Sequence, residues 1–229
     1  MKIVIRIICI LMIAFQTLSQ EEKERSDSTG FSFNIDLGVS SRNIWRGLDY
    51  GASPSVWGDL SGSYKNFSIG AIGTTTLNGS KAQFGTWLEL YACYEIKNFS
   101  FLVDDYFFFN AEDQDNDYFE YRPKYTQHLV EARVEYENNF LEAQVGYVIY
   151  SNQQDNTNGV YLEVTYKLNE NLSFTAGGIT GDQRLSFYDA GGITTLGING
   201  HRKISFLKHH LNLNASLSLI HISEPTRHS

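Results

Sequence analysis

The chain has 229 residues, a formal net charge of −8, 14 % aromatic residues and a mean hydropathy of −0.28. The acidic excess disfavours nucleic acid as a partner, because phosphate binding needs a basic surface. Only three prolines accompany 19 glycines, a composition that argues against a disordered chain.

Residues 1–19 are expected to form a signal peptide. Lys2 and Arg6 provide the positive region, and residues 7–15 form an apolar core too short to anchor stably in a bilayer. The mature chain then starts with a short periplasmic lead-in over residues 20–30. Once the signal peptide is removed, Cys93 is the sole cysteine, so no internal disulfide can stabilise the fold.

Apolar and polar residues alternate along the mature chain in segments of roughly ten residues, the length of a tilted membrane strand. Alternation is the mark of a strand whose two faces meet different surroundings. The expected strands cover residues 31–40, 56–64, 67–75, 87–95, 99–110, 130–136, 141–149, 160–168, 172–178, 193–204 and 210–216.

The connections between these strands are short and long in turn. Lys65-Asn66, Lys97-Asn98 and Asn138-Asn139 make tight turns, whereas the alternating connections are much longer. This asymmetry in a secreted, alternating chain is typical of a transmembrane β-barrel with its short turns in the periplasm. Near those turns, four outward tyrosines predict an interfacial aromatic girdle: Tyr64, Tyr94, Tyr136 and Tyr166.

The C-terminal stretch Leu217 to Arg227 reads LSLIHISEPTR. A transposase adapter used in preparing sequencing libraries encodes those eleven residues, so residues 217–229 are interpreted as an assembly artefact. Bacterial barrels have an even strand count. The prediction is therefore an all-β, antiparallel, up-and-down transmembrane barrel over residues 31–216, with about 12 strands when complete. About 11 of these are present, the C-terminal strand being lost to truncation.

The stretch SRNIWRGLDYGASPS, from Ser41 to Ser55, resembles the TorF family of porins. Members carry an aromatic-Arg-Gly motif after the first strand and a Ser-Pro before the second. Trp45-Arg46-Gly47 and Ser53-Pro54 fill these places, while Asn43 stands where a tyrosine is expected. The resemblance implies an outer-membrane barrel of largely unassigned substrate.

Charged and bulky aromatic side chains occupy the inward-facing positions of the expected strands. An acidic ring lowers the barrier for cations and raises it for anions, so these residues predict a narrow porin-like channel for ions or small solutes with a mild cation preference. Twelve strands about 4.8 Å apart give a backbone diameter of roughly 24 Å, which bulky side chains narrow further. The predicted pore-lining residues are Asp59, Trp87, Glu89, Tyr91, Asp104, Tyr106, Glu131, Arg133, Glu142 and Glu163.

Two alternatives to a channel remain at this stage. The polar lumen of a structural or adhesion barrel need not select any solute, and some outer-membrane barrels hydrolyse lipid through Ser and His. His128 lies at a strand end, but no recognisable motif ties a serine to it, so no enzymatic activity is predicted. No metal or cofactor is expected. Outer-membrane lipid, lipopolysaccharide, periplasmic chaperones and the barrel-assembly machinery are the expected partners, and the oligomeric state is left open.

One residue conflicts with the outward register. Asp105 falls among apolar outward residues near the middle of the membrane, at a cost on the order of 2 kcal/mol if it faced lipid. A β-bulge at Asp104-Asp105 would turn it away, and the sequence favours that interpretation.

Overall fold

The computed structural model describes residues 30–50, 52–78, 85–109, 117–153, 159–181, 191–206 and 209–220. The expected signal peptide, nearly all of the lead-in and residues 221–229 lie outside the described residues. Within the described ranges, no helix is long and apolar enough to cross a membrane.

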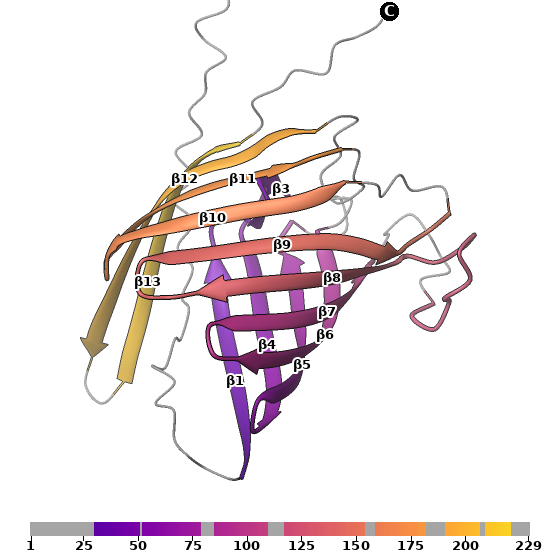
Figure 1. Ribbon diagram of the computed structural model, residues 1–229, viewed down its shortest axis with the longest axis horizontal. Coiled ribbons are helices and arrows are strands. Elements are labelled where there is room, and N and C mark those ends of the chain that lie inside the picture. Colours follow the sequence, from indigo (N-terminus) through magenta and orange to yellow (C-terminus); the bar gives the residue numbers. More distant parts are fainter. Residues whose placement is uncertain are drawn as a thin grey trace, which may run out of the picture.

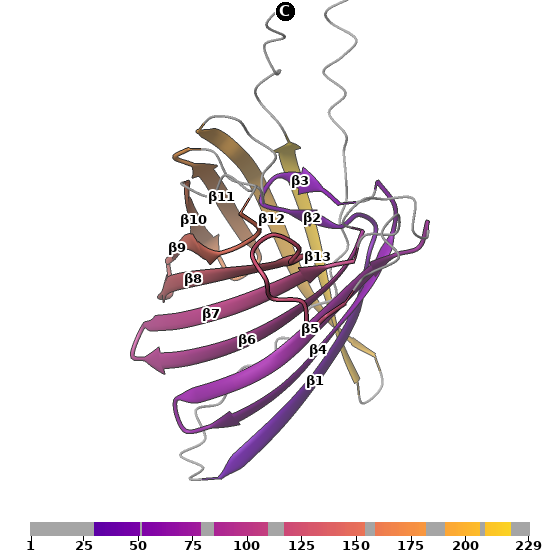
Figure 2. The same cartoon turned by 90° about the vertical axis from the view of Figure 1, so that its right-hand side faces the viewer.

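Eleven strands form one antiparallel sheet in chain order, as the alternation predicted. They are β1 (Phe31–Ser40), β4 (Ser55–Tyr64), β5 (Phe67–Thr76), β6 (Thr86–Ile96), β7 (Phe99–Phe108), β8 (His128–Glu137), β9 (Leu141–Tyr150), β10 (Val160–Asn169), β11 (Leu172–Ile179), β12 (Gly192–Phe206) and β13 (His209–Ile220). The sheet curves strongly (Figures 1 and 2), and no strand pairing joins β1 to β13 in the described part of the chain. The all-β antiparallel fold is confirmed, and barrel closure stays a prediction.

Two features of the strands differ from the expectation. β2 (Ile44–Trp45) and β3 (Leu48–Asp49) form a separate small hairpin inside a segment predicted as loop. At the other end, β13 continues to Ile220, and Leu217 pairs with Ile198 on β12.

The tight turns follow the sequence closely. Lys65 and Lys97 open the two-residue turns with φ of 54° and 55°, in the left-handed region that hairpin turns use. The hairpins lock the register, so Tyr64 pairs with Phe67 and Ile96 with Phe99. Because a strand alternates faces with period two, this register places every inward side chain of one strand beside inward side chains of the next.

The two faces of the sheet reverse the usual distribution of polarity. On the outer face Phe33, Ile69 and Val103 are 82 %, 55 % and 48 % exposed, whereas the inward Asp104 and Glu131 are 0 % exposed. A soluble sheet buries its apolar face and hydrates its polar face. Here the polar residues are enclosed by the curved sheet and the apolar residues face out.

The predicted bulge at Asp104-Asp105 is wrong. Asp105 pairs with Leu90 on β6 and with Val130 on β8, and neither register shifts at this position. The irregularity of this region lies between Val130 and Glu131, where β8 pairs with β9. Asp105 therefore faces outward, and its charge is compensated by neighbours from the following loop, described below.

Candidate functional site

The β2–β3 hairpin is built on a two-residue turn of Arg46 and Gly47. Trp45 pairs with Leu48 across it, and the turn residues have φ of 50° and 78°. Positive φ at both central positions is the requirement of a type I′ turn, which glycine meets without strain and arginine does not. Lys65 and Lys97 have a similar φ in their turns, but Arg46 differs from them in that its side chain makes contacts outside the hairpin.

Those contacts begin with Glu131 on β8. The Arg46 guanidinium donates from Nη1 and Nη2 to the two Glu131 carboxylate oxygens at 2.9 and 2.7 Å, and their side chains are 2 % and 0 % exposed. It also lies between the rings of Trp45 and Tyr161, 4.4 and 4.1 Å from their centroids. Burial by itself would lower the pKa of Arg46, but the Glu131 carboxylate more than offsets this and raises it.

Two further contacts join the hairpin to the wall. A Cβ added at Gly47 would lie 1.8 Å from the Thr194 carbonyl oxygen of β12, so only glycine fits there. The Trp45 ring lies 5.3 Å from that of Tyr106, in an apolar cluster of β7, β8 and β9 residues. One hairpin thus contacts β7, β8, β10 and β12, which it can do only because the sheet curves around it (Figure 2).

The rest of the first long connection braces the hairpin. The Tyr50 amide donates to the Asn43 carbonyl at 2.8 Å, and Arg42 pairs with Asp49 at 3.2 Å. Tyr50 is buried, which raises the pKa of its phenol. Ser53-Pro54, the second part of the sequence motif, lies directly before β4. Ser53 is buried, and the Pro54 carbonyl accepts a hydrogen bond from the Leu77 amide at 2.7 Å.

A second buried polar group lies next to this one on the inner face. Arg133 donates to Asp104 at 3.2 Å and pairs with Glu135 at 3.3 Å. The other Asp104 oxygen, Oδ2, has no hydrogen-bond partner within the described part of the chain. Glu89 is 6 % exposed and lies on the same inner face as Asp104. It is two residues before Tyr91 on β6, and Tyr91 pairs with Asp104 on β7.

The remaining predicted pore-lining residues also belong to the inner register. Tyr91 donates to Asp59 at 3.2 Å, and Lys167 pairs with Glu142 at 2.6 Å. Glu163 accepts hydrogen bonds from Gln144 at 2.8 Å and from Tyr161 at 2.5 Å. All ten predicted residues, Trp87 and Tyr106 included, lie on one face, but they form separate groups rather than one ring.

Inward glycines leave space for the largest inner side chains. A Cβ at Gly38 would meet the Trp57 ring at 2.4 Å, and one at Gly70 would meet the Tyr91 ring at 2.4 Å. A Cβ at Gly146 would meet the Glu131 carboxylate, also at 2.4 Å. These side chains lie flat across the neighbouring strand instead of standing into the enclosed space.

Residues 117–127, here named the cap loop, fold over the outer face. Asp105 accepts from Tyr121 Oη at 2.7 Å and contacts His128 Nδ1 at 2.8 Å, while His128 Nε2 lies 2.6 Å from the Tyr118 carbonyl oxygen. The Tyr121 ring stacks on His128, with centroids 3.9 Å apart. Burial and the hydrogen bond to Asp105 raise the pKa of Tyr121. His128 thus serves as a hydrogen-bond partner of Asp105, and no described serine bonds to its ring.

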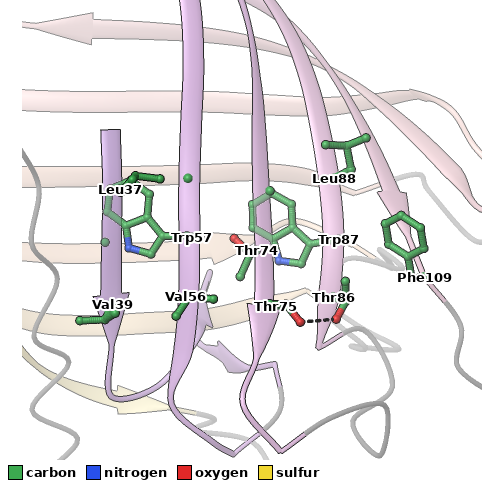
Figure 3. Close-up of a pocket in the computed structure, with 13 residues that line it drawn as sticks. Leu37, Val39, Val56, Trp57, Thr74, Thr75, Thr86, Trp87, Leu88 and Phe109 are labelled. Atoms are coloured by element: carbon green, nitrogen blue, oxygen red, sulfur yellow. Dashed lines mark hydrogen bonds between the residues drawn. The ribbon is translucent and has the colours of Figure 1, made fainter. Parts of the chain in front are cut away.

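The outer face also carries a shallow hollow of about 840 Å³ over β1 and β4 to β7 (Figure 3). Outward Leu37, Val56 and Leu88 line it, and Gly58 and Gly73 leave its floor without side chains. Its lining is almost wholly apolar, so it offers few partners to a polar solute.

The partner of Arg46 was not found from the sequence. The signal for the turn was present, since an X-Gly pair between two short alternating segments predicts a hairpin.

No group of three or more His, Cys, Asp or Glu residues able to hold a metal occurs among the described residues. Comparison with family models, with curated proteins and with solved structures finds no match to this chain.

Proposed function

We propose that this chain is an outer-membrane β-barrel that acts as a narrow channel for ions and small solutes, with a mild preference for cations. One observation carries the proposal: the sheet encloses its polar residues and exposes its apolar ones. The proposal includes membership of the TorF family, on the Trp45-Arg46-Gly47 motif, and a barrel in which β1 and β13 meet directly or through one further strand.

The membrane assignment follows from the outer face. Ten-residue strands with side chains such as Phe33, Ile69 and Val103 turned outward would cost free energy in water and gain it in lipid. In lipid, every backbone N–H and C=O must be paired, which a closed sheet achieves and an open one does not.

The channel assignment follows from the inner face. Among the described inward side chains, carboxylates outnumber the cationic groups of Arg46, Arg133 and Lys167, and several of these carboxylates have no cationic partner. A water-filled passage lined in this way attracts cations and repels anions.

A conductance measurement tests this function. The full-length chain is refolded in vesicles, checked for the faster migration of an unheated barrel on mild SDS gels, and fused with planar bilayers. We expect conductance steps with K⁺ favoured over Cl⁻. The pair Asp36→Asn and Asp59→Asn should shift the selectivity toward unity, because both carboxylates face inward, while Glu120→Gln in the cap loop should leave it unchanged.

Two results would contradict the proposal. Recovery in the soluble periplasmic fraction, without a heat-dependent gel shift, would exclude the membrane barrel. A heat-modifiable protein that inserts and never conducts would exclude the channel: lipid hydrolysis abolished by His128→Ala would then favour the hydrolase, and its absence a structural or adhesion barrel.

A further inference from the structure

We infer that the β2–β3 hairpin is a plug that closes the channel at its long-loop end, and that the channel conducts fully only when Arg46 leaves Glu131. The inference rests on the proposed channel function and adds its regulation. It begins from the position of the hairpin, which lies inside the curve of the sheet and contacts β7, β8, β10 and β12.

The hairpin is attached to the wall by side chains rather than by strand pairing. β2 and β3 pair only with each other, as a two-stranded sheet separate from the eleven-stranded one. Leaving the wall would therefore break no strand pairing of the main sheet. The contacts to be broken are the Arg46 ion pair, its stacking on Tyr161 and the packing of Trp45 on Tyr106.

The docked position also carries local costs. The buried Nε of Arg46 has no hydrogen-bond partner within the described residues, and both charges of the Arg46–Glu131 pair are withdrawn from water. These costs oppose the bidentate pair with Glu131. A segment held by side-chain contacts whose costs and gains oppose each other is the kind of element that can exchange between two positions.

The Thr194 contact supplies a way to undock the hairpin without changing any charge. Gly47→Ala places a Cβ where the Thr194 carbonyl oxygen already lies, at a backbone conformation that alanine rarely adopts. Gly73→Ala is the matched control, because nothing lies within 4 Å of its Cβ position and it faces away from the hairpin. Glu131→Gln is a second, independent variant that removes the ion pair and leaves the turn intact.

The test combines two measurements on the full chain, each on protein shown by its gel shift to be folded. Trypsin cleavage between Arg46 and Gly47, followed by mass spectrometry in detergent micelles, reports undocking whether or not the protein conducts. The more exposed Arg42, whose side chain is 23 % exposed, provides an internal reference. Conductance in planar bilayers reports opening.

We expect the wild type and Gly73→Ala to resist cleavage at Arg46 and to conduct in small steps. Gly47→Ala and Glu131→Gln should be cut at least tenfold faster there and conduct severalfold more. If both variants are cut faster but conduct like a conducting wild type, the hairpin is no plug and the channel proposal stands. Cleavage of the wild type as fast as of the variants also overturns the plug. Absence of conductance in every variant, the cut ones included, overturns the channel and the plug together.

Discussion

At the scale of single residues, Asp105 and His128 show how a charge is accommodated on the outer face. Both belong to the outward register among apolar neighbours, and the cap loop covers them. Both ring nitrogens of His128 contact oxygen atoms: Nδ1 contacts Asp105, and Nε2 lies beside the Tyr118 carbonyl. The pair is thus hydrogen-bonded on the outer face and sheltered by Tyr118 and Tyr121.

A double-mutant cycle measures this pair. His128→Leu alone removes the hydrogen-bond partner of Asp105 Oδ1, and we expect the free energy of unfolding in vesicles to fall by about 2 kcal/mol. The double variant Asp105→Leu with His128→Leu should recover most of that loss, because two apolar residues suit the outer face. Urea unfolding followed by fluorescence gives both values. Equal losses in the single and double variants would show that the two residues are not coupled.

At the scale of elements, two glycines of β5 show how the inner and outer faces of one strand differ in packing. Gly70 faces inward beneath the Tyr91 ring, whereas a Cβ at Gly73 would meet open space on the outside. Gly70 is therefore a site of close packing, whereas Gly73 leaves part of the wall uncovered. Gly38 beneath Trp57 and Gly146 beneath Glu131 are closely packed in the same way as Gly70.

The two glycines of β5 predict opposite effects of one substitution. Gly70→Ala must turn Tyr91 away from Asp59, and we expect a loss of about 1–2 kcal/mol in the free energy of unfolding, the range of overpacked sites. Gly73→Ala should be neutral or stabilising by about 0.5 kcal/mol, since it lowers the entropy of the unfolded chain. Urea titration of both variants in vesicles checks the difference, and losses of the same size would contradict the assignment of faces.

At the scale of the whole molecule, the exposed apolar belt separates a membrane protein from a soluble one. Val103, in the middle of β7, is 48 % exposed, and Phe119, in the cap loop, is 82 % exposed. In water, a charge at either position would be accepted with little effect, because neither side chain is buried in a core. In a membrane the two positions differ, since only Val103 would face hydrocarbon.

Val103→Arg and Phe119→Arg therefore form a matched pair. We expect Val103→Arg to reduce the free energy of unfolding from vesicles by about 2–4 kcal/mol, the cost of a cation at the membrane midplane, and Phe119→Arg to change it by less than about 0.5 kcal/mol. Both are measured by urea unfolding and by the fraction of protein that inserts. Wild-type stability in the Val103 variant would argue for a soluble sheet.

The sequence by itself determined the strands, their order and their faces. Alternation and tight turns are local, so Lys65-Asn66 and Lys97-Asn98 were sufficient to set the register of the hairpins they close. The same local pattern placed Asp105 outward correctly. The bulge inferred from it was wrong because Asp105 is compensated by Tyr121, from a loop that folds back over the sheet, and by His128, at the start of β8.

Only the tertiary structure decided where the long connections go. The first turns into the curve of the sheet and the cap loop turns over its outer face, although both are long connections between alternating strands. The Arg46–Glu131 pair joins residues 85 positions apart, and β8 reaches the hairpin only because the sheet curves. Period-two alternation specifies which face a residue occupies, but not which distant residue lies opposite it, because that depends on the curvature summed over all the intervening strands.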